Sequence, residues 1–390
     1  MRAIVLGAGL MGPVIARNLA ESREVSSVTI CDLDKNRLLR AQEWIANEKL
    51  ATKELNVSDE KAAAKAFEGF DVLCIALPPH LSIPANRAAM DAGINAVDLW
   101  FDAAMFDLDE ALRERGVSLI PGCGVAPGLT NILAGNAANK LDDVDDIHLL
   151  VGGLPVKPEP PLEYKVVFSL EGVWEEYTVK CPIYRDGKLM EAEALDGLET
   201  VEFPEPFGKM EAFYTAGLAT LLYTMKGRVK NMHEKTIRWP GHAEKIRLLR
   251  SMGFIGRETI EVDGFKVEPR RFTSALLSPL LHLDTTKERD VTLLRVIVSG
   301  VKENARVTYT YDMIDYFDEV AGVTSMAKTT ANTCAEVAKM VGRNEIKGVG
   351  LLAPESVLVG SLFDKLMMGL SARGVRISEK VTTTKLLGST

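Results

Sequence analysis

The sequence predicts an α/β fold in which a doubly wound parallel sheet is followed by a mixed α+β domain. Short apolar stretches alternate with helical segments over roughly the first third of the chain. The 390 residues exceed what one core usually organises. A Gly- and Pro-rich segment at residues 121–128 then marks a change of pattern. We therefore expect domains at residues 1–122 and 123–322, with residues 323–390 returning to the first domain and ending in a tail.

The alternation in the first domain is regular. We expect strands at residues 2–6, 28–31, 53–57, 72–77, 95–99 and 117–120, with a helix between each pair. Nearly continuous apolar strands are typical of a parallel sheet covered on both faces. Six of them predict the doubly wound, or Rossmann, nucleotide-binding fold.

Beyond residue 121 the expected strands include 147–151, 165–169, 236–238 and 293–299, which predict a mixed, mainly antiparallel domain. A helix rich in small residues is expected at 324–341, and residues 382–390 read as a fraying tail.

Composition excludes several classes of protein. The net charge is −8, and no dense Lys/Arg stripe is present, so a nucleic-acid partner is not expected. The chain has no apolar run long enough for a membrane span and no signal peptide, which predicts no membrane partner and a cytoplasmic location. The five cysteines contain no CxxC pair, and no set of His, Cys, Asp and Glu has metal-ligand spacing, so we expect reduced thiols and no metal.

The first expected strand runs into a glycine loop, Gly7-Ala8-Gly9-Leu10-Met11-Gly12. In a dinucleotide site Gly7 makes the sharp turn, Gly9 lets the backbone approach the pyrophosphate, and Gly12 lets the helix pack closely on the sheet. Pro13 starts the helix, whose N-terminal amides face the phosphates. Gly7, Gly9, Leu10, Met11 and Gly12 are therefore candidate cofactor-binding residues.

Asp32 lies twenty residues after Gly12, at the end of the second expected strand. A carboxylate there accepts from the ribose hydroxyls and would repel the 2′-phosphate of NADP, which favours NAD. The nearby Lys35 and Arg37 could soften this discrimination.

Ligands of open α/β sheets lie at the carboxyl ends of the strands. Leu77 and Pro78 follow the fourth expected strand and are candidates for contacting the nicotinamide ribose, and Gly124 in the turn after the sixth strand is another cofactor-binding candidate. Asp98 ends the fifth strand and could hold an amine or ammonia, although it could equally cap a helix or stabilise a loop.

Several longer motifs resemble the saccharopine dehydrogenase superfamily, and within it most closely the lysine 6-dehydrogenases. They are Gly124-Val-Ala-Pro-Gly128, residues 151–164 (VGGLPVKPEPPLEY), Phe168-Ser-Leu-Glu-Gly172, Glu211-Ala-Phe213 and residues 235–245 (KTIRWPGHAEK). The resemblance covers nearly the whole chain. It departs from the family pattern at Pro78-Pro79-His80 and at Trp100-Phe101-Asp102, beside the expected cleft.

The resemblance implies NAD-dependent oxidative deamination of L-lysine at its ε carbon. The products are ammonia and allysine, which cyclises to a piperideine carboxylate. It also implies a homodimer or a larger homo-oligomer.

Oxidation at a carbon that bears nitrogen requires a base to take the ammonium proton. In the family's TIR motif Arg238 is the candidate for holding the substrate carboxylate, with a structural ion pair as the alternative. His242 and Glu244 lie two apart, which on an extended segment places both on one face, so His242 is a candidate base that Glu244 orients. Asp98 completes the catalytic candidates. A structural role for each of them remains open.

Tyr164 and Glu211 stand in the recognisable stretches and are candidates for lining the lysine pocket. Two other functions remain open at this point. One is reductive coupling of an amine to a carbonyl compound, as in saccharopine-type and carboxynorspermidine-type enzymes. The other is a non-catalytic protein that senses NAD.

Overall fold

The structure, a computed structural model, describes residues 1–385. The chain divides into two compact units. Unit 1 comprises Met1–Lys140, Ala219–Lys226 and Ala327–Ile377, and unit 2 comprises Leu141–Leu218, Gly227–Met326 and the chain from Ser378. This division differs from the expected boundaries in four places: residues 123–140 and 219–226 belong to unit 1, and residues 323–326 and the chain from Ser378 belong to unit 2.

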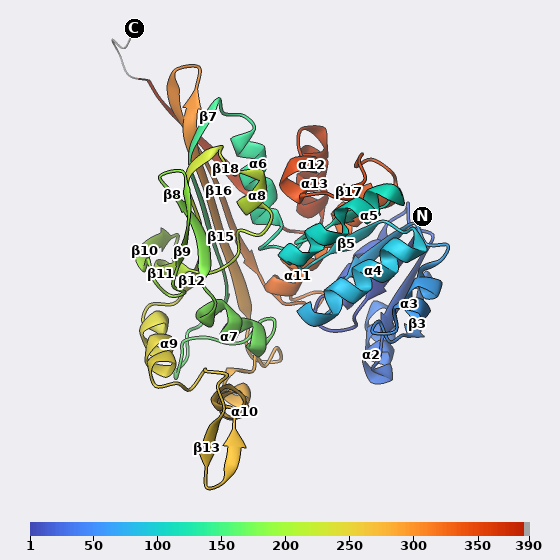
Figure 1. Ribbon diagram of the computed structural model, residues 1–390, viewed down its shortest axis with the longest axis horizontal. Coiled ribbons are helices and arrows are strands. Elements are labelled where there is room, and N and C mark those ends of the chain that lie inside the picture. The colour runs from blue at the N-terminus through green and yellow to red at the C-terminus, as the bar shows by residue number, and fades with distance from the viewer. Residues whose placement is uncertain (386–390) are drawn as a thin grey trace. The chain divides into compact units, whose positions relative to one another are not determined.

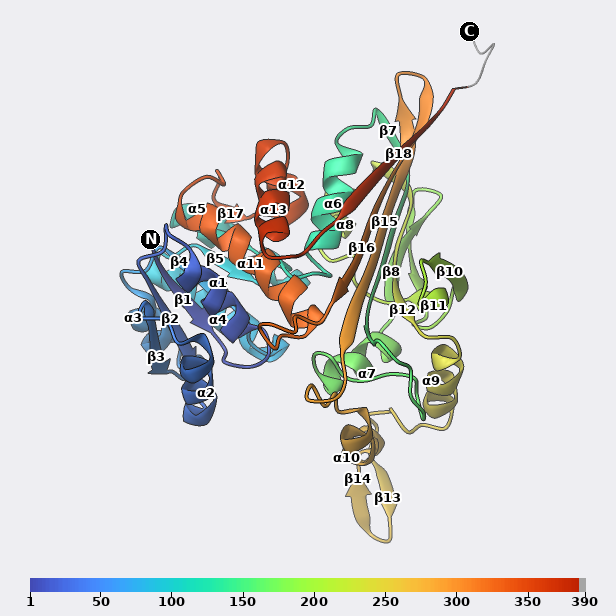
Figure 2. The ribbon, with the colours of Figure 1, turned by 180° about the vertical axis from the view of Figure 1, so that it is seen from behind.

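Unit 1 is built on a seven-stranded sheet in the order β17-β6-β5-β4-β1-β2-β3, in which every neighbouring pair is parallel (Figures 1 and 2). The predicted doubly wound fold is confirmed. Its strands are β1 (Arg2–Leu6), β2 (Ser27–Asp32), β3 (Leu50–Glu54), β4 (Val72–Ile75), β5 (Ala96–Asp98), β6 (Ser118–Ile120) and β17 (Gly350–Leu351).

Helices connect and flank these strands. The connecting helices are α1 (Gly12–Glu21), α2 (Lys35–Ile45), α3 (Glu60–Phe67), η1 (Pro79–Leu81), α4 (Ser82–Ala92), η2 (Ala103–Leu108) and α5 (Asp109–Glu114). The others are α6 (Leu129–Ala138), α8 (Leu221–Thr224), α11 (Ser325–Gly342), α12 (Pro354–Val357) and α13 (Ser361–Ala372). The helix predicted at 324–341 is confirmed as α11. No helix within residues 1–385 is long and apolar enough to cross a membrane.

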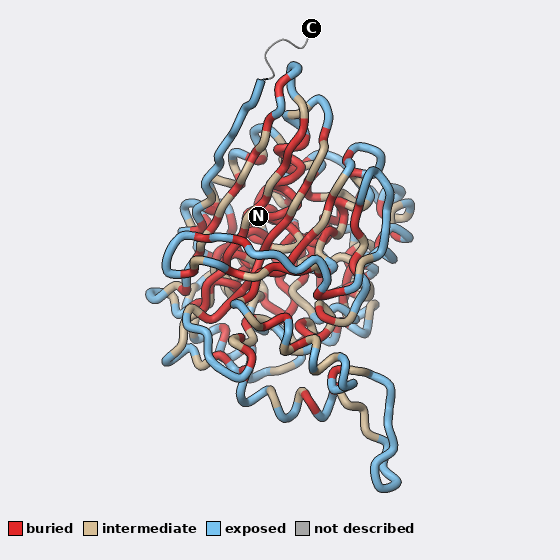
Figure 3. The backbone as a smooth tube through the Cα atoms, turned by 90° about the vertical axis from the view of Figure 1, so that its left-hand side faces the viewer, coloured by how far each residue is buried: buried red, intermediate tan, exposed pale blue. Residues whose placement is uncertain are grey.

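Unit 2 is built on a nine-stranded mixed sheet, whose main path is β10-β11-β12-β7-β15-β16-β18, with β8 and β9 attached beside β12. β12 and β7 pair in parallel and the other pairs are antiparallel. Much of the backbone of the long central strands is buried (Figure 3). The strands are β7 (Asp143–Pro155), β8 (Cys181–Arg185), β9 (Lys188–Ala192), β10 (Glu199–Phe203), β11 (Gly208–Tyr214), β12 (Val229–Arg238), β15 (Asp290–Lys302), β16 (Ala305–Tyr316) and β18 (Ser378–Thr384).

Three helices and a separate hairpin complete unit 2: α7 (Leu170–Thr178), α9 (His242–Ser251), α10 (Pro269–Leu281), and β13 (Ile260–Val262) with β14 (Phe265–Val267). The hairpin and α10 project from the rest of the unit in Figures 1 and 2.

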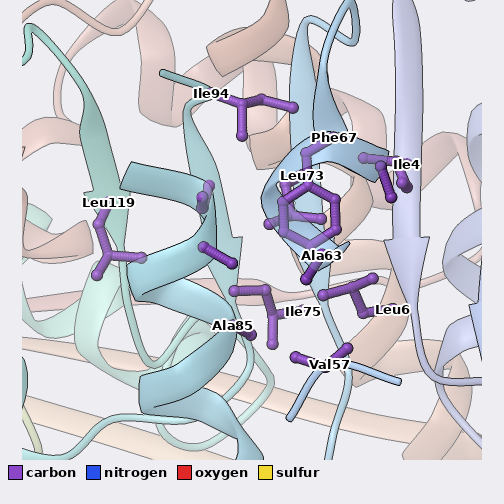
Figure 4. Packing of buried hydrophobic residues seen from close by; sticks show 14 of the residues in the cluster. Ile4, Leu6, Val57, Ala63, Phe67, Leu73, Ile75, Ala85, Ile94 and Leu119 are labelled. Carbon is purple, nitrogen blue, oxygen red and sulfur yellow. The ribbon is translucent and has the colours of Figure 1, made fainter. Parts of the chain in front are cut away.

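The core of unit 1 shows why its strands are so apolar. Ile4, Leu73 and Ile75 on the strands and Phe67 on α3 are fully buried and pack together (Figure 4). Because helices cover both faces of the sheet, alternation with polar residues would place polar groups in the core. The same packing fixes the strand ends, where the candidate nucleotide-binding residues lie.

Four expectations about elements are wrong. Residues 165–169 do not form a strand, although Val166 makes an isolated bridge to His282. The sheet of unit 1 has a seventh strand, because β17 from the returning segment pairs with β6. The third strand lies at Leu50–Glu54 rather than 53–57, because residues 50–54 are the ones that pair with β2, while Leu55 and Val57 are buried beyond the end of the strand. Residues 382–384 are not a fraying tail, because they belong to β18, which pairs with β16. Residues 386–390 of the expected tail lie outside the described chain.

Candidate functional site

The glycine loop of unit 1 has the geometry of a pyrophosphate cradle. Gly7 adopts φ +96°, and a Cβ on Gly12 would lie 1.7 Å from the carbonyl oxygen of Gly7. A Cβ on Gly9 would meet no atom within 4 Å, so Gly9 borders open space. Within the described chain no side chain caps α1, and its first amides are left for a ligand. These residues fit a dinucleotide phosphate.

Asp32 is held at the carboxyl end of β2 by the same loop. Its Oδ2 accepts from the Ala8 amide at 2.7 Å and its Oδ1 from the Asp34 amide at 2.8 Å. Each carboxylate oxygen keeps a second lone pair, which is what a ribose diol requires. The two nearby cations are engaged elsewhere: Lys35 pairs with Glu54 at 3.0 Å, and Arg37 lies 3.6 Å from Asp34.

The other predicted cofactor residues differ in availability. Leu10 is exposed, Pro78 is exposed before η1, and Leu77 packs partly on the core cluster. Gly124 is buried in the turn after β6, where its amide donates to Pro127 and its carbonyl accepts from Leu129. Both backbone polar groups of Gly124 therefore serve the turn itself.

Asp98 ends β5 as a buried carboxyl group with three donors. The Ser82 hydroxyl lies 2.5 Å and the Asn86 amide 2.8 Å from Oδ2, while the Trp100 amide lies 2.9 Å from Oδ1. Burial raises the pKa of Asp98 to about 6, and these three hydrogen bonds lower it in part. A carboxyl group with a pKa near 6 can exchange a proton close to neutral pH.

Aromatic rings gather after β5, where the motif departs from the family pattern. The rings of Phe101, Phe106 and Tyr223 lie with centroids 4.5–6.1 Å apart, and Phe106 and Tyr223 are 39% and 46% exposed. Tyr223 comes from α8, a short segment that α12 secures. Glu355 of α12 accepts from the hydroxyls of Thr220 and Thr224 at 2.8 and 2.6 Å.

Arg238 lies at the end of β12 in unit 2, enclosed by aromatic and acidic groups. Its Nε donates to the Tyr177 hydroxyl at 2.9 Å, an Nη donates to Glu176 at 3.0 Å, and the Tyr164 ring lies 4.6 Å from the guanidinium carbon. The side chain of Arg238 is 2% exposed, whereas that of Glu176 is 32% exposed. In this arrangement Arg238 is a buried ion pair, which was the alternative to its predicted role in holding a carboxylate.

His242 does not have the properties of a base. Its Nδ1 donates to the Leu162 carbonyl at 2.7 Å, so its Nε2 accepts from the Tyr177 hydroxyl at 2.9 Å. The ring is fully buried, and burial together with the Arg238 charge lowers the pKa of His242 to about 3. The expectation that His242 takes up a proton near neutral pH is wrong for this geometry.

Glu244 and Glu211 are also placed differently from the prediction. α9 begins at His242, so residues 242 and 244 are about 200° apart around a helix instead of on one face of a strand. Glu244 is exposed in the first turn. Glu211 accepts from the amides of Gly241 and Ala243 at 2.9 and 2.6 Å and thereby caps this helix.

Sequence reasoning missed Glu176 and Tyr177, which lie four and five residues beyond the recognised stretch ending at Gly172. Both belong to α7, which Ser169 caps. If residues 170–178 had been predicted to form a helix, Glu176 and Tyr177 would have been placed about one turn beyond Gly172.

Family models match almost the whole chain. Residues 3–120 match the saccharopine dehydrogenase NADP binding domain, and residues 124–375 match the saccharopine dehydrogenase C-terminal domain. The chain belongs to the saccharopine dehydrogenase family. The predicted superfamily is therefore confirmed, and with it an oxidoreductase with a nucleotide-cofactor-binding domain.

Two relatives in this family are distant in sequence but match over nearly their whole length. The chain is 23% identical to saccharopine dehydrogenase (NADP(+), L-glutamate-forming) of Schizosaccharomyces pombe, covering 97% of this chain and 98% of that protein. It is 22% identical to carboxyaminopropylagmatine dehydrogenase of Synechocystis, covering 91% and 92%. The apo structure of saccharopine dehydrogenase (L-Glu forming) from Saccharomyces cerevisiae has a TM-score of 0.80 at 20% identity, covering 98% and 99% of the two chains. That likeness shows the shared fold.

Proposed function

We propose that this member of the family oxidatively deaminates L-lysine at the ε carbon with NAD. In the reaction the ammonium group loses a proton to a base, and the ε carbon gives a hydride to the nicotinamide when the cofactor is bound. Water adds to the resulting iminium carbon, and ammonia leaves to give allysine, which cyclises with its own amino group.

The observation that carries the proposal is the environment of Asp98. It combines a carboxyl group at the end of β5, whose pKa is about 6, with the group of aromatic rings that begins at Phe101 in the segment after that strand and includes the partly exposed Phe106 and Tyr223. Aromatic faces attract ammonium groups, and a carboxylate near its pKa can take the proton that an amine must lose before hydride transfer. Asp98 is our candidate base in place of His242.

The direct test is NADH formation, followed at 340 nm, when the purified chain is given L-lysine and NAD. Allysine is then detected as its cyclic product, and the ammonia assay should give as much ammonia as NADH. L-Ornithine and a lysine methylated at the ε nitrogen serve as matched comparison substrates. Absence of turnover across these amines, with cofactor binding intact, would favour the NAD-sensing alternative.

Asp32 supports NAD over NADP in this proposal, although the matching family domain is described as NADP binding. Replacing Asp32 with serine removes the charge that repels a 2′-phosphate. We expect the ratio of kcat/KM for NAD to that for NADP to fall by about tenfold or more. Glu43→Gln is the matched control, because Glu43 is an exposed carboxylate near the end of α2 and its loss leaves the Lys35–Glu54 pair intact. Equal ratios in wild type and Asp32→Ser would contradict the assignment.

The role of Asp98 predicts a pH effect of Ser82→Ala. The Ser82 hydroxyl stabilises the charged carboxylate, so its loss raises the pKa of Asp98 further. Activity requires the deprotonated base, so the acid limb of the kcat/KM profile should lie near pH 6 in the wild type and move to higher pH in the variant. The measurement is kcat/KM from pH 5 to 9. A limb that stays in place shows that another group acts as the base.

Reductive coupling is the second candidate, and the activities for which these relatives are named favour it. It requires a carbonyl co-substrate and NADH or NADPH. The discriminating measurement is oxidation of the reduced cofactor in the presence of an amine together with a keto acid or an aldehyde. Turnover that depends on both compounds, with none from lysine and NAD, would replace the first proposal with this one.

A further inference from the structure

The hairpin β13–β14 has one apolar face and one charged face. Asp263 and Gly264 form its two-residue turn with φ +51° and +82°, as a type I′ turn requires. Ile260 lies opposite Val267 and Val262 opposite Phe265 on one face, and the Glu261–Lys266 pair lies on the other. Ile260, Val262 and Phe265 are 52%, 46% and 73% exposed. The apolar face is thus turned to solvent.

Helix α10, directly after the hairpin, is apolar on two sides. Its inner side is anchored: the Trp174 indole of α7 donates to Ser274 at 2.8 Å, and Thr273 donates to the Phe254 carbonyl at 2.7 Å. Its outer side presents an apolar stripe at the i, i+3, i+4, i+7 and i+8 spacing of a packing helix face. The stripe consists of Phe272, Ala275, Leu276, Pro279 and Leu280.

These two faces together form a sizeable apolar surface. Phe272, Leu276 and Leu280 are 52–57% exposed, and the projecting hairpin is exposed along its length (Figure 3). At roughly 80–100 Å² for each of the six half-exposed side chains, the two faces together offer roughly 500–600 Å². That is at the upper end of the usual apolar patch of a monomer, and it supplies most of the roughly 800 Å² that each partner buries in a stable protein interface. An isolated two-stranded hairpin is also marginal in water and gains stability from packing on a helix.

The charges around the two faces indicate what covers them. The hairpin segment 258–268 carries four carboxylates against one lysine, whereas α10 carries no carboxylate and presents one exposed arginine, Arg271 beside Phe272. The other arginine of α10, Arg270, is buried and pairs with Glu175 of α7. The hairpin is therefore complementary to α10 in charge as well as in apolarity. Because each chain has both faces, a two-fold symmetric dimer would contain two copies of the hairpin–helix contact and would cover all four faces.

We propose that β13–β14 of one chain docks on the outer stripe of α10 of a second copy, and reciprocally, to form a dimer. The acidic hairpin disfavours an anionic membrane surface as the occupant. The proposal does not depend on which amine the protein oxidises.

Cross-linking between two differently tagged chains tests the contact directly. One chain carries Phe265→Cys, and the other carries Leu276→Cys. The five native cysteines are all buried, so the introduced thiols are the accessible ones. With diamide as oxidant, we expect the mixed disulfide to form at least about ten times faster than with a Phe265→Cys and Met368→Cys pair. Met368 is a suitable control because it is 73% exposed and lies on α13 of unit 1. Equal rates for the two pairs would overturn the proposed contact.

Sedimentation equilibrium of the untagged full chain measures how much the proposed contact contributes to the dimer dissociation constant. Phe265→Glu and Leu276→Glu should each raise the dimer dissociation constant about tenfold or more, and Met368→Glu should leave it unchanged. Thermal melts show whether the variants remain folded, which is expected at such exposed positions. A monomeric wild type, a dimer unaffected by both substitutions, or a monomer that binds neutral lipid vesicles through this hairpin would each refute the proposal.

Discussion

Valine in place of Gly12 is expected to weaken dinucleotide binding by about a hundredfold or more. The added Cβ would lie 1.7 Å from the Gly7 carbonyl oxygen, which belongs to the backbone and cannot move aside cheaply. The loop and the start of α1 must therefore separate, and the phosphate-binding amides separate with them. Isothermal titration with NAD and with NADP measures the loss, and a chemical melt measures the accompanying loss of stability.

Gly9→Ala is the informative partner of that substitution. A Cβ on Gly9 meets no protein atom within 4 Å, so the free energy of unfolding should stay close to the wild-type value. Affinity should still fall, because the methyl group occupies the space through which the pyrophosphate approaches the backbone. Unchanged affinity in Gly9→Ala would show that the cofactor does not bind over this loop.

Replacing Arg238 with methionine is expected to lower the free energy of unfolding by about 2–3 kcal/mol. A broken buried ion pair typically costs more, but Glu176 is 32% exposed and water can solvate it in the variant. The Tyr177 hydroxyl also loses a donor at 2.9 Å. Urea unfolding followed by circular dichroism gives the stability change. If Arg238 also binds the substrate carboxylate, the role that the sequence predicted for it, the KM for lysine rises at least tenfold in the same variant.

A double variant separates the two roles of Arg238. Adding Glu176→Gln removes the unpaired charge, so part of the lost stability should return. The KM for lysine should remain high, because the cation is still absent. Recovery of both stability and KM in the double variant would mean that Arg238 is structural only.

The nucleotide-binding half was predictable because its signals are local. The glycines and Asp32 act through a turn, a helix start and a strand end that adjoin one another in sequence. β17 was not predictable in the same way, since its two residues become a strand only by pairing with β6, more than two hundred residues earlier. Short strands of this kind are specified by tertiary contacts and not by their own composition.

His242 illustrates a different limit. Its motif indicated a candidate base, but its protonation depends on Tyr177, Leu162 and Arg238, which come from three other segments. Spacing in sequence carries no information about such burial. The hairpin at 260–267, by contrast, had a readable signal that our sequence analysis did not use: Asp263-Gly264 lies between alternating apolar residues.

The segment Ala219–Lys226, which Glu355 holds in place, belongs to a unit assembled from three separate parts of the chain, and this affects folding during synthesis. The chain passes between the two units after residues 140, 218, 226, 326 and 377. Unit 1 therefore lacks its seventh strand, β17, until nearly the whole polypeptide has left the ribosome. It also lacks α12, whose Glu355 holds α8 in place. Folding during synthesis can give only a partial nucleotide-binding unit, whose sheet edge at β6 stays open for the tens of seconds that translation of the remaining residues takes.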